Sequence, residues 1–139
     1  MSTRGRKAEL KTIDGGLSGV PKAPAEIPDC MLSEWNAVAA DLVERKLLTV
    51  AMMGVLSTYI IALWSVRQAQ KAVEEHGLLV KTAHNMLKPN PASGVLSKSS
   101  EQVARLSAEL GLTPAARSKQ QFTSKKGDAH DGAPPGLDY

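Results

Sequence analysis

The sequence is poor in the residues that hold together a small secreted protein or fill a large core. Cys30 is its only cysteine, so no disulfide can form within the chain, and we expect a reducing compartment. Aromatic residues make up 4% of the 139 residues, which is few for a compact monomer that must bury its own centre. These shortages favour one small domain that covers part of its apolar surface with other chains.

Motifs for catalysis and metal binding are also missing. The stretch "GGLSGVPK" (15–22) has the wrong spacing for a phosphate-binding loop, and no helix follows it. No set of Cys and His residues has the spacing of zinc ligands, and Asp128, His130 and Asp131 stand in a tail rich in Gly and Pro. No paired carboxylates indicate a pocket for acid–base chemistry. We therefore expect no enzyme, no catalytic residues, no metal site and no cofactor.

Positive charge gathers toward the two ends of the chain. Residues 1–22 hold five basic and two acidic side chains, and residues 111–126 hold four basic side chains and no acidic one. Basic ends on a nearly neutral body are typical of flexible contacts to a polyanion, although solubilising tails give the same pattern. The candidate DNA-binding residues are Arg4, Arg6, Lys7, Lys11, Lys22, Arg117, Lys119, Lys125 and Lys126.

A long uncharged run extends from Leu47 to Val66, "LLTVAMMGVLSTYIIALWSV". Its length and hydropathy are enough to nominate a membrane span. Hydroxyl residues interrupt it, however, and the helical pattern continues through "RQAQKAVEEHG". A helix that is apolar on all sides can equally be buried in a protein assembly, so the run by itself leaves both possibilities open.

Periodicity and turn residues predict three regions. Residues 1–29 are rich in Gly, Pro and Lys without apolar periodicity, which predicts a flexible, disordered basic arm. A helical oligomerisation core is expected over 30–117, and a flexible C-terminal tail over 118–139. The core begins with an amphipathic helix over 33–46, with Ser33 as its N-cap.

The second expected helix, 50–76, is the longest, with Thr49 as its N-cap and Gly77 at its end. It has two apolar stripes, and the first helix can cover only one of them. The other stripe faces lipid or another copy of the chain. The expected oligomer-interface residues are Val55, Tyr59, Ile60, Ile61 and Trp64.

A small β-hairpin is expected near 78–88, with Asn85 in a tight turn. Such a hairpin is marginal in water by itself, so we expect it to pack on a neighbour. Asn90 is then the N-cap of a third helix, Pro91 takes its first position, and Gly111 ends it. Thr113 and Pro114 form a second cap-and-first-position pair, which makes a short fourth helix possible.

Several short landmarks occur in a specific order over residues 4–119. They are "RGRK" (4–7), "IP" (27–28) before Trp35, "LLT" (47–49), the pair Tyr59 and Trp64, "EEHGLLV" (74–80), "KPNPA" (88–92) and "LGLTPAAR" (110–117). In this order and spacing they resemble the small terminase subunits of tailed double-stranded-DNA bacteriophages. Two features depart from that family. Val50–Met53 replaces a commonly acidic position, and the arm has only Lys22 in place of a "GNPGKR" cluster.

The resemblance implies a mainly α protein of three to four helices with a small β-hairpin, assembling into a ring. It implies a non-enzymatic factor that recognises double-stranded viral DNA and presents it to the large terminase, which carries the motor and the nuclease. The C-terminal tail is the expected contact for the large subunit, nine is the favoured number of subunits, and the place of action is the host cytoplasm during phage assembly. Under this resemblance, a neighbouring subunit rather than lipid covers the long helix.

Two alternatives from other classes stay open. One is a small phage membrane protein of holin type that spans at residues 47–66. The other is a helical protein–protein adaptor that does not bind DNA. Fractionation without detergent separates the first alternative from the packaging factor, and the salt dependence of DNA binding separates the second.

Overall fold

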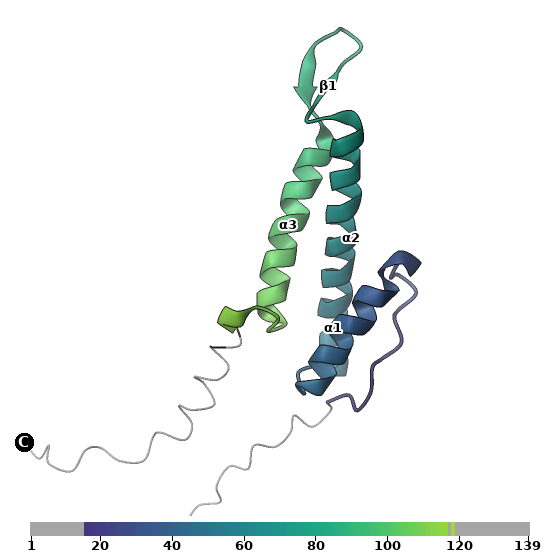
Figure 1. Ribbon diagram of the computed structural model, residues 1–139, viewed down its shortest axis with the longest axis vertical. Coiled ribbons are helices and arrows are strands. Elements are labelled where there is room, and N and C mark those ends of the chain that lie inside the picture. Colours follow the sequence, from purple (N-terminus) through teal and green to yellow (C-terminus); the bar gives the residue numbers. More distant parts are fainter. Residues whose placement is uncertain (1–15, 117, 119–139) are drawn as a thin grey trace, which may run out of the picture.

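The computed structural model describes residues 16–116 and 118 (Figure 1). This part of the chain contains three long α-helices, a short helical turn that starts at residue 114, and one two-stranded antiparallel sheet. The elements are the 3-10 turn η1 (Asp29–Met31), α1 (Leu32–Glu44), the 3-10 turn η2 (Val50–Met52), α2 (Met53–His76), β1 (Leu79–Lys81), β2 (Leu87–Pro89) and α3 (Pro91–Glu109). The predicted mainly α fold with a small β-hairpin is therefore confirmed.

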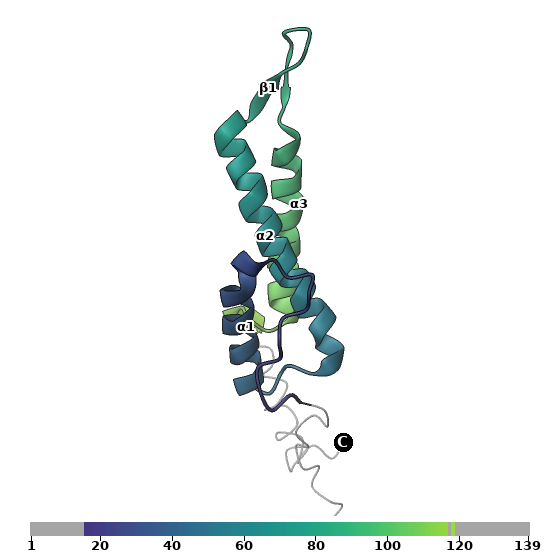
Figure 2. The same cartoon turned by 90° about the vertical axis from the view of Figure 1, so that its right-hand side faces the viewer.

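The molecule is elongated, and its two ends are built differently (Figures 1 and 2). Helices α2 and α3 run antiparallel and side by side, and the β-hairpin continues beyond them at one end. Helix α1 packs on the first half of α2 at the other end. One end is thus a three-helix unit, and the other is a two-helix unit that carries the hairpin.

The apolar core lies at the three-helix end. Trp35 on α1 and both Leu56 and Ile60 on α2 are completely buried. The cluster is formed by Ile27, Met31, Trp35, Ala39, Leu42, Leu48, Leu56, Ile60 and Leu110. Because Leu110 belongs to this cluster, the end of α3 is fixed to α1 and α2 by apolar burial.

Residues 16–29 belong to the folded body, which corrects the predicted boundary of the flexible arm at residue 29. The backbone N–H of Leu17 donates to the carbonyl of Leu48 at 3.1 Å, beside an antiparallel bridge between Gly16 and Thr49. Ile27 is buried in the core, and the Trp35 indole N–H donates to the Pro21 carbonyl at 3.0 Å. The prolines here prevent a helix but allow an extended segment to pack along α1. Residues 1–15 of the predicted arm lie outside the described residues.

The N-cap predicted at Ser33 is wrong, and Thr49 holds the predicted N-cap position, before η2, without a capping side-chain bond. Ser33 lies inside α1. A 3-10 turn precedes each helix, in which the Leu32 N–H donates to Asp29 and the Met53 N–H donates to Val50. In these turns, backbone carbonyls accept hydrogen bonds from N–H groups that would otherwise need a capping side chain. Neither helix therefore needs a side-chain cap.

Asn90 joins the end of α2 to the start of α3. Its Oδ1 accepts from the Ala92 N–H at 3.0 Å, which confirms the predicted N-cap. Its Nδ2 also donates to the Gly77 carbonyl at 2.9 Å, and its backbone N–H donates to the Leu78 carbonyl at 2.8 Å. Gly77 leaves α2 with φ of 83° and ψ of 171°, a conformation that favours glycine. One buried side chain therefore sets the geometry from which the hairpin projects.

Candidate functional site

The segment that follows α3 is held in place at Gly111. Gly111 has φ of 72°, as its predicted helix-ending role requires, and the Arg45 guanidinium donates to its carbonyl at 2.7 Å. Arg45 is in turn paired with Asp41 at 3.0 Å on α1. The Ala116 N–H then donates to the Thr113 hydroxyl at 3.2 Å, as expected for a second cap. The four basic candidates beyond this point, Arg117, Lys119, Lys125 and Lys126, lie outside the described side chains.

The N-terminal part of the described chain begins at the same end of the molecule. Gly16 is held beside Thr49, at the three-helix end, and the chain leaves Ala116 at that end too (Figures 1 and 2). Lys22 is exposed and follows Pro21, whose carbonyl accepts from Trp35 near the start of α1. Arg4, Arg6, Lys7 and Lys11 lie outside the described residues. The two predicted basic segments are therefore attached to one end of the body, opposite the hairpin.

The five predicted interface residues on α2 do not share one environment. Ile60 is completely buried in the core of its own chain and has no surface to offer another copy. The remaining four, Val55, Tyr59, Ile61 and Trp64, are half-buried at the edge of that core. A one-residue step along the helix separates a core residue from a partly exposed one, and periodicity alone did not distinguish Ile60 from Ile61.

Tyr59 is the one described residue with a resolved shift in acidity. Burial raises the pKa of its hydroxyl above the usual value, and the negative charge of Glu34 raises it further. Glu34 is paired with Arg67 at 2.6 Å, an exposed bridge between α1 and α2. Tyr59 is therefore a neutral side chain at physiological pH, compatible with a half-buried protein contact.

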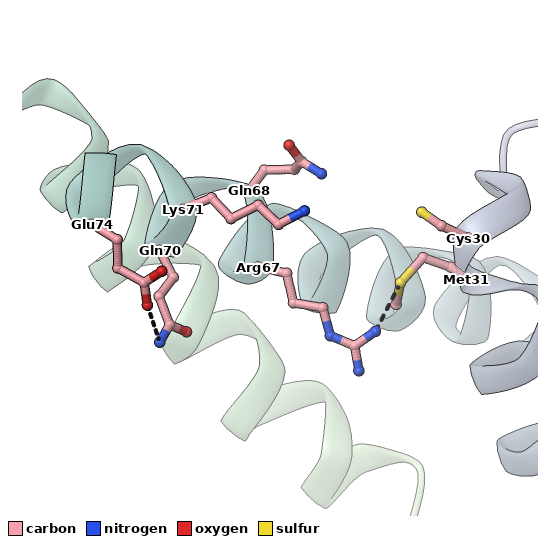
Figure 3. Close-up of a pocket in the computed structure, with 7 residues that line it drawn as sticks. All are labelled: Cys30, Met31, Arg67, Gln68, Gln70, Lys71 and Glu74. Carbon is pink, nitrogen blue, oxygen red and sulfur yellow. Dashed lines mark hydrogen bonds between the residues drawn. The ribbon is translucent and has the colours of Figure 1, made fainter. Parts of the chain in front are cut away.

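A shallow groove of about 380 Å³ runs between η1 and the second half of α2 (Figure 3). The Arg67 guanidinium donates to the Met31 sulfur at 3.3 Å across it, and Gln70 donates to Glu74 at 3.4 Å along its rim. Cys30 and Lys71 also line the groove. The sequence reasoning missed it, because it arises where a turn and a helix distant in sequence meet.

The hairpin exposes large apolar side chains. Leu78, Leu79, Met86 and Leu87 are 66%, 54%, 69% and 62% exposed. The register pairs Leu79 with Pro89 and Lys81 with Leu87, and Asn85 turns the chain with φ of 62°, as expected. The sequence predicted a hairpin that needs a neighbour, and the structure identifies the side chains that such a neighbour would cover.

Clusters of metal-binding side chains were sought over the described residues. Residues 16–116 and 118 contain no group of three or more His, Cys, Asp or Glu side chains that could hold a metal ion. His76 and Glu75 approach to 3.9 Å, but both are well exposed at the end of α2. Asp128, His130 and Asp131 lie outside the described residues.

The segment Val50–His76 is long and apolar enough to cross a membrane, with a mean hydropathy of 1.5 in its best window. Only 22% of that window is buried in the single chain. A core helix of a soluble assembly passes the same test, so this property alone does not separate lipid from a neighbouring subunit.

Comparison with known proteins gives one match. The model of the family described as phage terminase, small subunit, matches residues 32–127, which includes α1, α2, the hairpin and α3. No match was found among curated proteins or among solved structures. The matched region spans more than half of the sequence. The chain belongs to the phage terminase small-subunit family.

Proposed function

We propose that this protein is a non-enzymatic, ring-forming packaging factor that recognises double-stranded viral DNA and presents it to the large terminase. Family membership supports a role in genome packaging. The observation that supports DNA contact best is the common origin of the two basic segments. Both are attached at the three-helix end, so a ring would gather them on one rim (Figure 1).

In a ring, the modest positive charge of each chain would repeat from subunit to subunit and give one side of the ring a high density of positive charge. Residues 111–126 carry four basic side chains and no acid, and residues 1–22 add five basic and two acidic ones. Phosphate contacts through such segments require little geometric precision and supply affinity rather than sequence readout. Arg45 and Leu110 fix the position from which the C-terminal segment leaves the body.

Assembly is supported by apolar surface that the single chain leaves uncovered. Val55, Tyr59, Ile61 and Trp64 are only half-buried, and Val50 is 72% exposed at the start of the same helical segment. Contiguous exposed apolar surface marks interaction sites in soluble proteins. Val55 and Tyr59 lie on one flank of the buried stripe of α2, and Ile61 and Trp64 lie on the other flank. We place neighbouring subunits against these flanks, and native mass spectrometry would give the number of subunits, for which nine remains the proposal.

Two truncations test the basic rim. Removal of residues 1–15 deletes Arg4, Arg6, Lys7 and Lys11, and leaves the packed segment from Gly16 intact. Removal of 119–139 deletes Lys119, Lys125 and Lys126. DNA affinity is measured against salt, where each lost phosphate contact lowers the log–log slope by about 0.9. If neither truncation changes affinity or slope, DNA contacts lie on the folded body and the basic rim is excluded.

Removal of 128–139 is the matched control, since it deletes the acidic part of the tail and keeps every basic candidate. We expect it to leave the salt slope of DNA binding unchanged. The same truncations are tested for binding to the large terminase, because the C-terminal tail is our proposed contact for that partner. A tail truncation that loses the large subunit and keeps DNA binding assigns the tail to the protein partner alone.

The apolar length of Val50–His76 favours one second candidate, a membrane protein of holin type. We propose instead that the protein acts without a membrane, in the host cytoplasm during phage assembly. Fractionation of the full chain without detergent separates the two. Recovery as a uniform oligomer in the soluble fraction supports the packaging factor, and recovery only from membranes supports the alternative. A soluble oligomer without affinity for DNA would indicate a protein–protein adaptor.

A further inference from the structure

The end of the hairpin has the composition of a protein contact. Leu78, Leu79, Met86 and Leu87 all expose more than half of their surface, and we call these four residues, with Lys81 and Lys88, the hairpin tip. A two-stranded hairpin is marginally stable by itself, and clustered exposed apolar side chains mark interaction sites. The hairpin tip is therefore expected to be covered in the working form of the protein.

The charges of the hairpin tip have one sign. Residues 76–100 contain three lysines and no aspartate or glutamate. Lys81 and Lys88 are exposed and make no ion pair with any residue that the structure describes. A partner of complementary chemistry would present acidic side chains around an apolar contact.

The same chain presents such a surface elsewhere. Residues 23–44 contain five acidic residues and no lysine or arginine. Glu26 and Asp29 are exposed beside η1, next to the exposed Cys30 and to Leu32, which is 38% exposed. We call these four residues the η1 surface. The groove of Figure 3 opens beside it, between Met31 and the second half of α2.

A single chain cannot bring these two surfaces together. The start of α1 lies beside the middle of α2, whereas the hairpin extends beyond the far ends of α2 and α3 (Figures 1 and 2). Complementary surfaces at two different places on one molecule produce a heterologous contact between copies. Repetition of such a contact closes a ring when the rotation between copies allows it.

We propose that the hairpin tip of one subunit docks on the η1 surface of the next. Leu78 and Met86, which share one face of the hairpin, lie over the neighbouring groove, and Lys88 on that face and Lys81 on the opposite face lie beside Glu26 and Asp29. The contact rests on the assembly proposed above and adds to it a defined pair of surfaces. DNA is a poorer occupant of the tip, because phosphates would engage the two lysines and leave four large apolar side chains in water.

The single cysteine of the chain provides a direct test. In Met86→Cys, the full chain carries one thiol at the hairpin tip and its native Cys30 on the η1 surface. The oligomer is treated with a mild oxidant or with a short bifunctional maleimide, which tolerates more separation than a disulfide. We expect a ladder of covalent multimers on a denaturing gel.

Two matched controls define the outcome. Met86→Cys combined with Cys30→Ser should give no ladder, and Ser97→Cys, which places the second thiol on the exposed side of α3, should give none either. Dimers from the variant that lacks Cys30 would show that two tips meet each other, which overturns the proposal. Absence of a ladder in Met86→Cys while native mass spectrometry shows the oligomer also overturns it, and leaves the proposed assembly standing. A monomeric wild-type chain would exclude both the hairpin contact and the proposed ring assembly.

Charge reversal gives an independent test. Lys81→Glu with Lys88→Glu, and separately Glu26→Lys with Asp29→Lys, should each weaken association by about tenfold or more, because like charges then face each other. The four substitutions together restore opposite charges at every contact and should recover association. Circular dichroism checks that helix content is unchanged. If the fourfold variant is no better than either pair, or if the hairpin pair loses DNA binding and keeps its oligomer, the proposed contact is excluded.

Discussion

The three-helix end and the two-helix end of this molecule are stabilised by different means. The first buries Trp35, Leu56 and Ile60 completely in a continuous apolar cluster. The second buries small or polar side chains between α2 and α3, among them Ala69, Ser99 and Asn90. Small side chains allow two helices to approach closely but remove little apolar area from water. The three-helix end therefore holds most of the chain's own stability, and the two-helix end depends on hydrogen bonds and on a partner.

The largest expected effect is the loss of the core at the three-helix end. Trp35→Ala should lower the free energy of unfolding by about 3–5 kcal/mol, because it leaves a cavity and removes the indole bond to Pro21. Asn36→Ala, the next position on α1 and exposed to solvent, is the control and should cost much less. Denaturant titration measures both. Equal costs would mean that the apolar cluster is not the main source of stability.

At the other end, Asn90→Ala should cost about 1–2 kcal/mol, since it removes the N-cap of α3 and leaves the Gly77 carbonyl without its buried donor. Asn90→Asp keeps an oxygen for the Ala92 N–H and loses the donor, so it separates the two contributions. Hydrogen exchange should show loosening confined to the hairpin and the adjoining helix ends. Loosening of α1 would contradict the division into two ends.

Substitution of glycines inside the helices should raise the free energy of unfolding, whereas the two preceding substitutions lower it. A methyl group at Gly54 in α2 or at Gly94 in α3 would meet no atom within 4 Å. Gly→Ala at either position should therefore stabilise the fold by about 0.5–1 kcal/mol. Gly77→Ala is the contrasting variant and should destabilise it, because its φ of 83° is strained for alanine. Thermal melts of the three variants are sufficient, and a destabilising Gly94→Ala would indicate that this surface is covered in the assembly.

The smallest expected effect is at alkaline pH. The pKa of Tyr59 is raised in the folded chain, so ionisation is easier in the unfolded chain. The corresponding stability is complete below about pH 10, the unfolded value, and is lost as the pH rises through the folded pKa. Tyr59→Phe should remove this alkaline component from the pH dependence of unfolding. In Tyr139→Phe, Tyr59 is the single remaining tyrosine, and its ultraviolet titration should show a midpoint above that of the unfolded chain.

Short sequence patterns predicted much of the local geometry around the hairpin and at the ends of α2 and α3. Asn90 with Pro91, Gly77, Asn85 and Gly111 each act where they were predicted to act. A cap or a positive φ depends on a few neighbouring backbone groups, so short patterns specify it. The order of the helices follows from apolar periodicity and turn residues, and the family suggested by the sequence is confirmed by the family match.

Which surfaces are covered became known from the three-dimensional arrangement of the elements. It placed residues 16–29 in the folded body, buried Ile60 but not Ile61, and replaced the side-chain caps expected at Ser33 and Thr49 by 3-10 turns. It also showed that both basic segments start at one end and that the hairpin tip is bare at the other. Burial depends on partners distant in sequence, and a period of 3.6 residues gives the faces of a helix without saying what lies against each one.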